Sequence, residues 1–314
     1  GGGGGRNKPK ASSHGKATVN HNRHRAPVTC VRFSTKGDYI ASCSRDRTLK
    51  VWTNDGIELS TLEGHGGTVR WCAFSHDDYQ MVSCSWDRTL RLWKVGTWEL
   101  MNTLVGHRGI VHCCSISNDG LMIASGSEDS TVKIWGARQG IEVKTLQGHS
   151  MNVRTCAFSP TAPLLASAGN DGSIKIWSTK QWKEVSTLSG HSGGIVSVNW
   201  ANNGASLLSC SEDGTVKVWD TAKWGAGAGT GPLYSHNVED LDLTGASFFG
   251  DGAFFATSSN DKVLKVHQSE DNKLRSKFFG LGPMKCIDTW EDRISSGDTE
   301  GRVYLLQSHS LINK

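Results

Sequence analysis

Histidine, serine and aspartate recur together along this 314-residue chain, and proteins combine these three side chains for nucleophilic catalysis. Each set also carries a tryptophan, which lies 28 residues after the histidine and six after the aspartate. The serine lies four residues before the aspartate. The five sets are His24, Ser42, Asp46 and Trp52; His65, Ser83, Asp87 and Trp93; His107, Ser125, Asp129 and Trp135; His149, Ser167, Asp171 and Trp177; and His191, Ser209, Asp213 and Trp219.

The repetition argues against catalysis. A catalytic site needs one such group beside a pocket, whereas this chain has five, each tied to a tryptophan at constant spacing. Successive tryptophans of the sets are 41, 42, 42 and 42 residues apart, which is the mark of an internal repeat. We therefore predict a structural role for the five sets and no enzymatic activity.

The elements that must position these residues are strands. In the first repeat Thr29–Phe33, Tyr39–Cys43 and Thr48–Trp52 contain β-branched and aromatic residues, and turn-forming residues such as Lys36–Asp38 separate them. A fourth, outer strand is predicted over Ile57–Leu62. Four short strands in a period of about 42 residues are typical of one blade of a β-propeller.

The Gly-His, Asp and Trp positions at fixed spacing resemble the WD-repeat (WD40) family, over residues 16 to 307. Only Trp219-Asp220 keeps the literal Trp-Asp pair. The resemblance implies an all-β fold, a seven-bladed propeller with four antiparallel strands per blade. It also implies that each set forms a hydrogen-bonded tetrad running from indole to hydroxyl to imidazole to carboxylate. Such a satisfied network fixes one local geometry.

Two degenerate copies follow the five complete ones. His236, Thr257, Asp261 and His267 form the sixth, and Ser296, Glu300 and Leu306 form a seventh that has lost its histidine and tryptophan.

The ends of the chain predict how the ring closes. Only seven residues follow the third strand of the seventh unit, Arg302–Gln307, so its fourth strand must come from elsewhere. Lys16–His21 lies where other units carry their outer strand, and we predict that it pairs with the last blade and removes an exposed sheet edge. The predicted organisation is a flexible, basic, Gly-rich arm (1–15), one propeller (16–307) and a C-terminal tail (308–314).

One position in each repeat varies in a way that indicates recognition. By the resemblance, the residue before each turn aspartate faces solvent on the face that such proteins most often use for partners, here called the top face. These residues are Arg45, Trp86, Glu128, Asn170, Glu212 and Asn260. We interpret Trp86 as a partner anchor, because Trp, Tyr and Arg dominate interface hot spots. The alternative is that its ring lies flat against Arg88 or Arg45.

A second set is expected on the same face, at the fifth residue after each histidine and at the matching places of the degenerate units. Its members are Thr29, Arg70, His112, Arg154, Val196, Thr244 and Lys285. With Arg45 and Arg88 they are expected to make one sector positive, while Glu128 and Glu212 make another negative. A basic and aromatic sector suits an acidic peptide, a phosphorylated segment or an RNA backbone; a mixed solvated surface is the alternative.

Composition narrows the class of protein. The 34 basic residues exceed the 30 acidic ones by four, and residues 1 to 25 carry six basic side chains and no acid. The nine cysteines include no C-x-x-C pair, and most lie in strand-like runs: Cys30, Cys43, Cys72, Cys84, Cys114, Cys156 and Cys210. We interpret them as reduced packing residues of a cytoplasmic or nuclear protein. No run approaches the roughly 18 apolar residues of a membrane helix. We expect no cofactor, metal or small-molecule substrate.

Two functions from different classes follow. The first is a non-catalytic scaffold that docks a peptide or protein loop on the top face as part of a larger complex. The second is a ribonucleoprotein subunit that contacts RNA or DNA through the basic arm and through Arg70, Arg154 and Lys285; its binding would weaken steeply with salt. The run from Cys286 to Leu306 is also similar to the C-terminal propellers of nucleotide-binding WD-repeat scaffolds of the telomerase-, vault-associated or apoptosome type, which implies a sensor or docking part.

Overall fold

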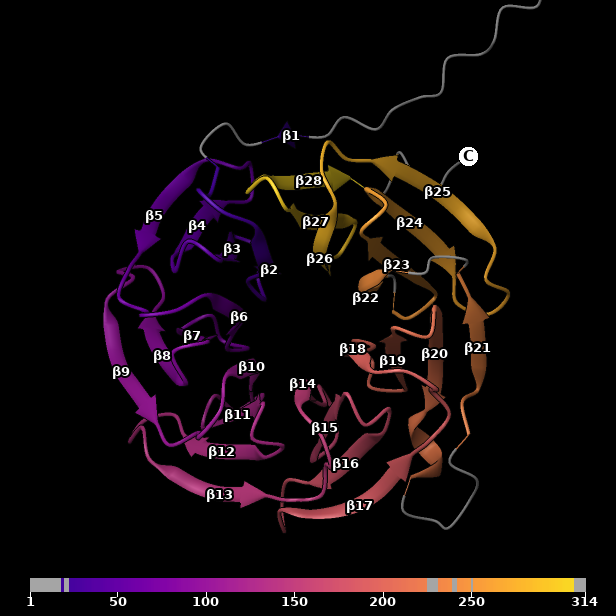
Figure 1. Ribbon diagram of the computed structural model, residues 1–314, viewed down its shortest axis with the longest axis horizontal. Coiled ribbons are helices and arrows are strands. Elements are labelled where there is room, and N and C mark those ends of the chain that lie inside the picture. Colours follow the sequence, from indigo (N-terminus) through magenta and orange to yellow (C-terminus); the bar gives the residue numbers. More distant parts are fainter. Residues whose placement is uncertain (1–17, 20–22, 225–230, 239–241, 250, 308–314) are drawn as a thin grey trace, which may run out of the picture.

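Seven small sheets arranged in a ring make up the fold. The computed structural model describes residues 18–19, 23–224, 231–238, 242–249 and 251–307. Within these ranges the chain forms seven four-stranded antiparallel sheets around a central axis, as Figure 1 shows, and one short 3-10 helix, η1 (Thr221–Lys223). The predicted seven-bladed, all-β propeller is confirmed. No helix in the described ranges has the length and apolar character needed to cross a membrane.

Each of the first six blades is built from four consecutive strands, the first innermost and the last at the rim (Figure 1). In chain order the blades are β2 (Val28–Phe33), β3 (Tyr39–Ser44), β4 (Leu49–Thr53), β5 (Glu58–Leu62); β6 (Val69–Phe74), β7 (Gln80–Ser85), β8 (Thr89–Lys94), β9 (Leu100–Val105); β10 (Val111–Ile116), β11 (Met122–Ser127), β12 (Val132–Gly136), β13 (Glu142–Leu146); β14 (Val153–Phe158), β15 (Leu164–Gly169), β16 (Ile174–Ser178), β17 (Lys183–Leu188); β18 (Ile195–Trp200), β19 (Ser206–Ser211), β20 (Thr215–Asp220), β21 (Tyr234–Asn237); and β22 (Leu243–Phe249), β23 (Phe254–Ser259), β24 (Val263–Gln268), β25 (Leu274–Phe279). The seventh contains β26 (Met284–Trp290), β27 (Arg293–Asp298) and β28 (Val303–Gln307).

The apolar core lies between neighbouring blades. Leu90 and Leu104 of the second blade pack in one cluster with Val111, Ile123 and Trp135 of the third, and all five are buried. A blade therefore buries its apolar faces only against its neighbours, and the ring has to close for the first and last blades to bury theirs.

The N-terminal strand closes the ring. β1 (Thr18–Val19) pairs antiparallel with β28, with Thr18 opposite Leu305 and Val19 opposite Tyr304. It lies at the outer edge of the seventh blade (Figure 1). The predicted closure is confirmed at these two residues; the rest of the predicted strand, residues 16–17 and 20–21, the arm and the tail lie outside the described residues.

The predicted strands of the first blade end within one residue of the observed ones. The assignment of His236 to the start of the sixth unit is wrong. His236 lies in β21, the outer strand of the fifth blade, opposite Val216. Sequence spacing could not separate these positions, because a histidine in an outer strand and one in the following loop are only a few residues apart.

Candidate interaction site

The five predicted tetrads are all formed. In each, the tryptophan Nε1 donates to the serine Oγ at 2.8–2.9 Å. The histidine Nε2 lies 2.7–2.9 Å from the same Oγ, and its Nδ1 lies 2.7–2.9 Å from the aspartate Oδ2. Because a carboxylate only accepts, Nδ1 donates to the aspartate, while the serine hydroxyl accepts from the indole N–H and joins it to Nε2 of the histidine.

The tetrads hold turns in place. The five serines are fully buried, so their hydroxyls are closed to a substrate. In the second blade the other carboxylate oxygen of Asp87 accepts from the backbone and hydroxyl of Thr89. Partial burial alone would raise the pKa of Asp87, but hydrogen bonds from His65 and Thr89 outweigh it and hold the pKa well below its ordinary value. The hydrogen bonds of Asp87 thus fix the turn that carries Trp86.

The sixth blade replaces the tetrad with stacked rings. Tyr234, His236, Phe255 and His267 lie in sequence with centroid separations of 5.9, 5.7 and 5.1 Å and interplanar angles of 6–18°. His236 Nε2 lies 2.7 Å from the carbonyl oxygen of Ser269 and donates to it. The sixth unit, predicted as a degenerate copy, therefore has no tetrad of the kind seen in the other five, because His236 faces an aromatic ring and a backbone carbonyl in place of a hydroxyl and a carboxylate.

The seventh blade has its own polar network, which sequence analysis missed. Asp298 is fully buried at the end of β27. Its carboxylate accepts from the backbone of Glu300 and Arg302 at 2.9 Å, from Arg302 Nη1 at 3.1 Å and from the Tyr304 hydroxyl at 2.7 Å. Ser296 Oγ, without a histidine partner, donates to the Cys286 carbonyl at 2.7 Å.

A pocket of about 810 Å³ opens at the centre of the top face. In all seven blades the pairing of the first two strands shifts by one residue at a β-bulge. A bulge leaves one residue out of the ladder and re-aims its side chain. The bulged residues are Thr29, Arg70, His112, Arg154, Val196, Thr244 and Lys285, and all seven line the pocket. These are the residues of the second predicted set, so the bulge explains why they face one site.

A second ring of residues follows the second strand of each blade. In every blade this residue donates its backbone N–H to the carbonyl two residues before the bulge, as Trp86 does to Thr68 at 2.9 Å. Arg45, Trp86, Asn170, Glu212, Asn260 and Thr299 line the pocket. Thr299 was missed because the seventh unit lacks its turn aspartate. Glu128 and Arg88 are exposed residues outside the pocket wall.

The predicted separation into a positive and a negative sector is wrong in one respect. Arg154 donates to Glu212 across neighbouring blades and, at 3.4 Å, to Asn170 Oδ1. Its charge is therefore compensated within the pocket. Arg70 donates to the carbonyl of Thr29 at 3.1 Å, and Lys285 donates to Asn260 Oδ1 at 2.6 Å; neither acceptor is a carboxylate.

His112 is neutral in this setting. Its Nε2 is buried without a hydrogen-bond partner among the described residues. Burial, together with the positive charges of Arg70 and Arg154, lowers the pKa of His112 from 6.5 to about 4.

The stability of the fold should therefore decrease on acidification between pH 6.5 and about 4. In that window His112 takes up a proton in the unfolded chain but not in the folded one. This difference lowers the free energy of unfolding by about 2–3 kcal/mol at pH 4.5. Urea unfolding at pH 7 and 4.5 measures this loss, and His112→Asn should reduce it. His76→Asn, at an exposed turn of the second blade, is the control. Equal losses in wild type and His112→Asn would contradict the assignment.

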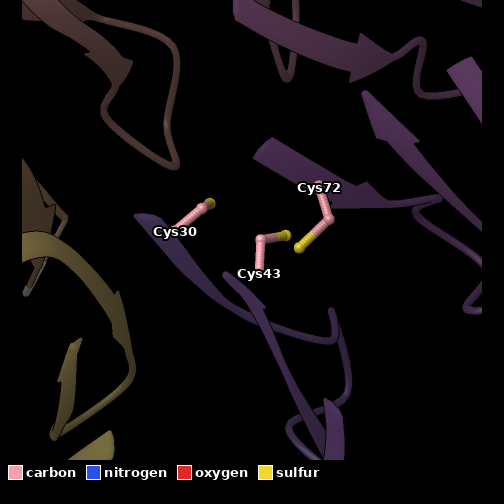
Figure 2. Close-up of side chains that lie close together, drawn as sticks. All are labelled: Cys30, Cys43 and Cys72. Carbon is pink, nitrogen blue, oxygen red and sulfur yellow. The ribbon is translucent and has the colours of Figure 1, made fainter. Parts of the chain in front are cut away.

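Three cysteines come close enough to be weighed as a metal site. The Sγ atoms of Cys30, Cys43 and Cys72 lie within 4.8 Å of one another, at the junction of β2, β3 and β6 (Figure 2). Structural zinc takes four ligands, and the described residues supply no fourth one at that distance. All three are buried, and they pack with Val69 and the other apolar residues between the first two blades. The burial matches the predicted packing role, and all nine cysteines of the chain are buried.

Comparison with known proteins identifies repeats of the same kind. The family model described as "IFT122 first beta-propeller" matches residues 72–310, and the one described as "WD domain, G-beta repeat" matches residues 15–53. Eukaryotic translation initiation factor 3 subunit I of Vanderwaltozyma polyspora is 45% identical over 47 residues, which are 15% of this chain and 14% of that protein. WD repeat domain-containing protein 83 of Xenopus tropicalis is 44% identical over 55 residues, 17% of this chain and 18% of that protein. These matches each span less than a fifth of the relative's length.

Proposed function

Because the chain belongs to the WD-repeat β-propellers, in the family described as IFT122 first beta-propeller, we propose that it is a non-catalytic scaffold. In this proposal a peptide or loop of a partner protein docks on the top-face pocket, and the chain works in the cytoplasm or nucleus as part of a larger complex. One similar protein is by its name a subunit of an initiation factor, which agrees with work in an assembly. The likeness to nucleotide-binding WD-repeat scaffolds stays a prediction.

Trp86 carries the proposal. Trp86 is 44% exposed in the wall of the pocket, on a turn fixed by the Asp87 tetrad and by its own backbone bond to Thr68. The cations that lie over tryptophan rings in the described chain are Arg32 and Lys50, over Trp71 and Trp52. The alternative in which Arg88 or Arg45 covers the ring of Trp86 therefore finds no support. A large aromatic on a rigid turn loses little conformational entropy on binding, which suits an anchor.

The charges of the pocket favour an acidic partner segment. Four cations line it, Arg45, Arg70, Arg154 and Lys285. Of the carboxylates in the described residues, those of Glu212 and Asp242 do so. Electrostatic complementarity of this kind sets specificity and speeds association.

A ribonucleoprotein role is the second candidate, supported by the same cations and by the basic arm, which lies outside the described residues. Compensation of Arg154 by Glu212 weakens this candidate, because it leaves the uncompensated cations on one side of the pocket, whereas nucleic-acid grooves carry them along a track.

Affinity capture from cell extract tests the proposal, using wild type, Trp86→Ala and the charge reversal Arg70→Glu/Arg154→Glu, with and without nuclease at two salt concentrations. We expect a protein that wild type retains to be lost with Trp86→Ala and to be indifferent to nuclease. Tyr79→Ala is the matched control, because Tyr79 is a 53% exposed aromatic in the turn between β6 and β7 of the same blade, outside the pocket. Capture that collapses with nuclease and salt, and survives Trp86→Ala, would favour the ribonucleoprotein role.

A further inference from the structure

Three cations of the pocket have no carboxylate partner in the described residues. Lys285, Arg45 and Arg70 belong to the seventh, first and second blades, which are neighbours in the ring. We infer that these residues, here called the cation trio, bind one phosphoryl group carried by the docked peptide; the inference rests on the proposed function. The proposed function requires only an acidic partner segment, whereas this inference specifies one phosphorylated residue within that segment.

The trio is held in place and still has free donors. Arg70 uses one N–H on the Thr29 carbonyl, and Lys285 uses one on Asn260. A guanidinium has five donors and an ammonium three, so most of theirs remain. Arg45 is exposed, and its side chain makes no hydrogen bond to the described residues. Two of the three side chains are therefore oriented before a ligand arrives, and the third is free to close on it.

The charge of the trio matches a phosphoryl group better than a carboxylate. Of the two carboxylates in the wall, Glu212 is paired with Arg154. Among the described residues of the wall, Asp242 is then left to offset the three cations, which leaves an excess of two positive charges in this part of the chain. A phosphorylated serine, threonine or tyrosine carries about −1.5 to −2 at neutral pH and three acceptor oxygens, whereas a glutamate or aspartate carries −1. One phosphorylated residue thus neutralises the trio, and one acidic residue does not.

The cations also repel one another. Burial and the nearby Arg45 and Arg70 lower the pKa of Lys285, although Asp242 opposes this. Burial and Arg154, which is not part of the trio, lower the pKa of Arg70. Cations that are crowded and partly desolvated cost folding free energy, and an anion bound among them would remove that cost. The arrangement is therefore better matched to a bound state than to the empty pocket.

A peptide fits this geometry better than a nucleic acid. The trio covers three adjacent blades, and Trp86, in the second of them, is exposed beside it. On the far side of the pocket Arg154 is compensated and Val196 is apolar. The pocket thus offers one point of positive charge with an aromatic neighbour, which suits one phosphorylated side chain followed by an apolar or aromatic contact.

Binding of peptide pools to the immobilised full chain tests the inference. Three pools of random sequence carry a fixed central phosphoserine, glutamate or serine. We expect about tenfold more retention of the phosphoserine pool than of the serine pool, and clearly more than of the glutamate pool. Inorganic phosphate should compete. Arg45→Gln and Lys285→Gln should each lower the retention of the phosphoserine pool about fivefold or more. Arg88→Gln, which removes one charge from the turn that carries Trp86 but outside the pocket, should change it less than about twofold.

Several outcomes would overturn the inference: equal retention of the phosphoserine and glutamate pools, an equal loss with Arg88→Gln, or displacement by single-stranded RNA in preference to phosphopeptide. If the pools are retained equally while Trp86→Ala still abolishes capture of the cellular partner, the trio site fails and the docking function stands. If capture does not depend on Trp86, the proposed function fails whatever the pools show.

Discussion

Replacing Trp93 by alanine is expected to lower the free energy of unfolding by about 3–5 kcal/mol, the range for loss of a buried aromatic. Trp93 is 3% exposed, packs in the cluster between the first two blades, and donates through Nε1 to Ser83 at 2.9 Å. The substitution opens a cavity and removes one partner of a buried hydroxyl. Replacing Trp86, seven residues earlier, should change the free energy of unfolding by less than about 1 kcal/mol.

Urea unfolding of the two variants measures the difference, and Trp93→Phe serves as a graded control. Phenylalanine keeps most of the packing but lacks the indole N–H, so an intermediate loss of about 1–2 kcal/mol is expected. Equal destabilisation by Trp86→Ala and Trp93→Ala would refute the division between an anchor on the surface and a tetrad in the core.

The fold was predictable because its information is local and repeated. Every blade uses the same spacing, so His65, Ser83, Asp87 and Trp93 can be placed by comparison with four other copies within the chain. A buried leucine at or next to the end of the outer strand repeats in the same way in the first four blades: Leu62, Leu104, Leu146 and Leu188. Closure by an N-terminal strand was predictable because the residues after the third strand of the seventh unit are too few to supply its fourth strand.

The candidate site was only half predictable. Its two rings of positions follow from the repeat, because a bulge and a turn occur at the same place in every blade. The pairing of Arg154 with Glu212 could not be predicted, since the two lie 58 residues apart and meet only through the geometry of adjacent blades. Because Arg154 is paired, the pocket cations left without a carboxylate partner in the described residues are Lys285, Arg45 and Arg70. The sixth unit was misread for another reason: His236 lies in an outer strand, where its partners are the stacked ring of Phe255 and a backbone carbonyl.

Asp298→Ala is expected to destabilise the closing blade by about 3 kcal/mol, which is typical of losing the acceptor in a buried charged network. The carboxylate holds the turn between β27 and β28 by three donors from Glu300 and Arg302 and meets the Tyr304 hydroxyl, which also accepts from the backbone of Leu281 at 3.1 Å. Without it, the Tyr304 proton and the turn amides lose their partner in a place that water does not reach.

The position of this network predicts which strands of the ring lose stability first in Asp298→Ala. β28 is the strand on which β1 closes the ring, and Tyr304 itself lies opposite Val19. Hydrogen exchange in Asp298→Ala should therefore accelerate first in β27 and β28 and later in the blades that carry tetrads. Glu300→Ala, at an exposed position of the same turn, should change the free energy of unfolding by less than about 0.5 kcal/mol. Uniform acceleration around the ring would show that the seventh blade is no weaker than the others. Acceleration confined to the seventh blade would mean that Asp298 does there what the histidine tetrads do elsewhere, because each holds the turn between the second and third strands from within the core.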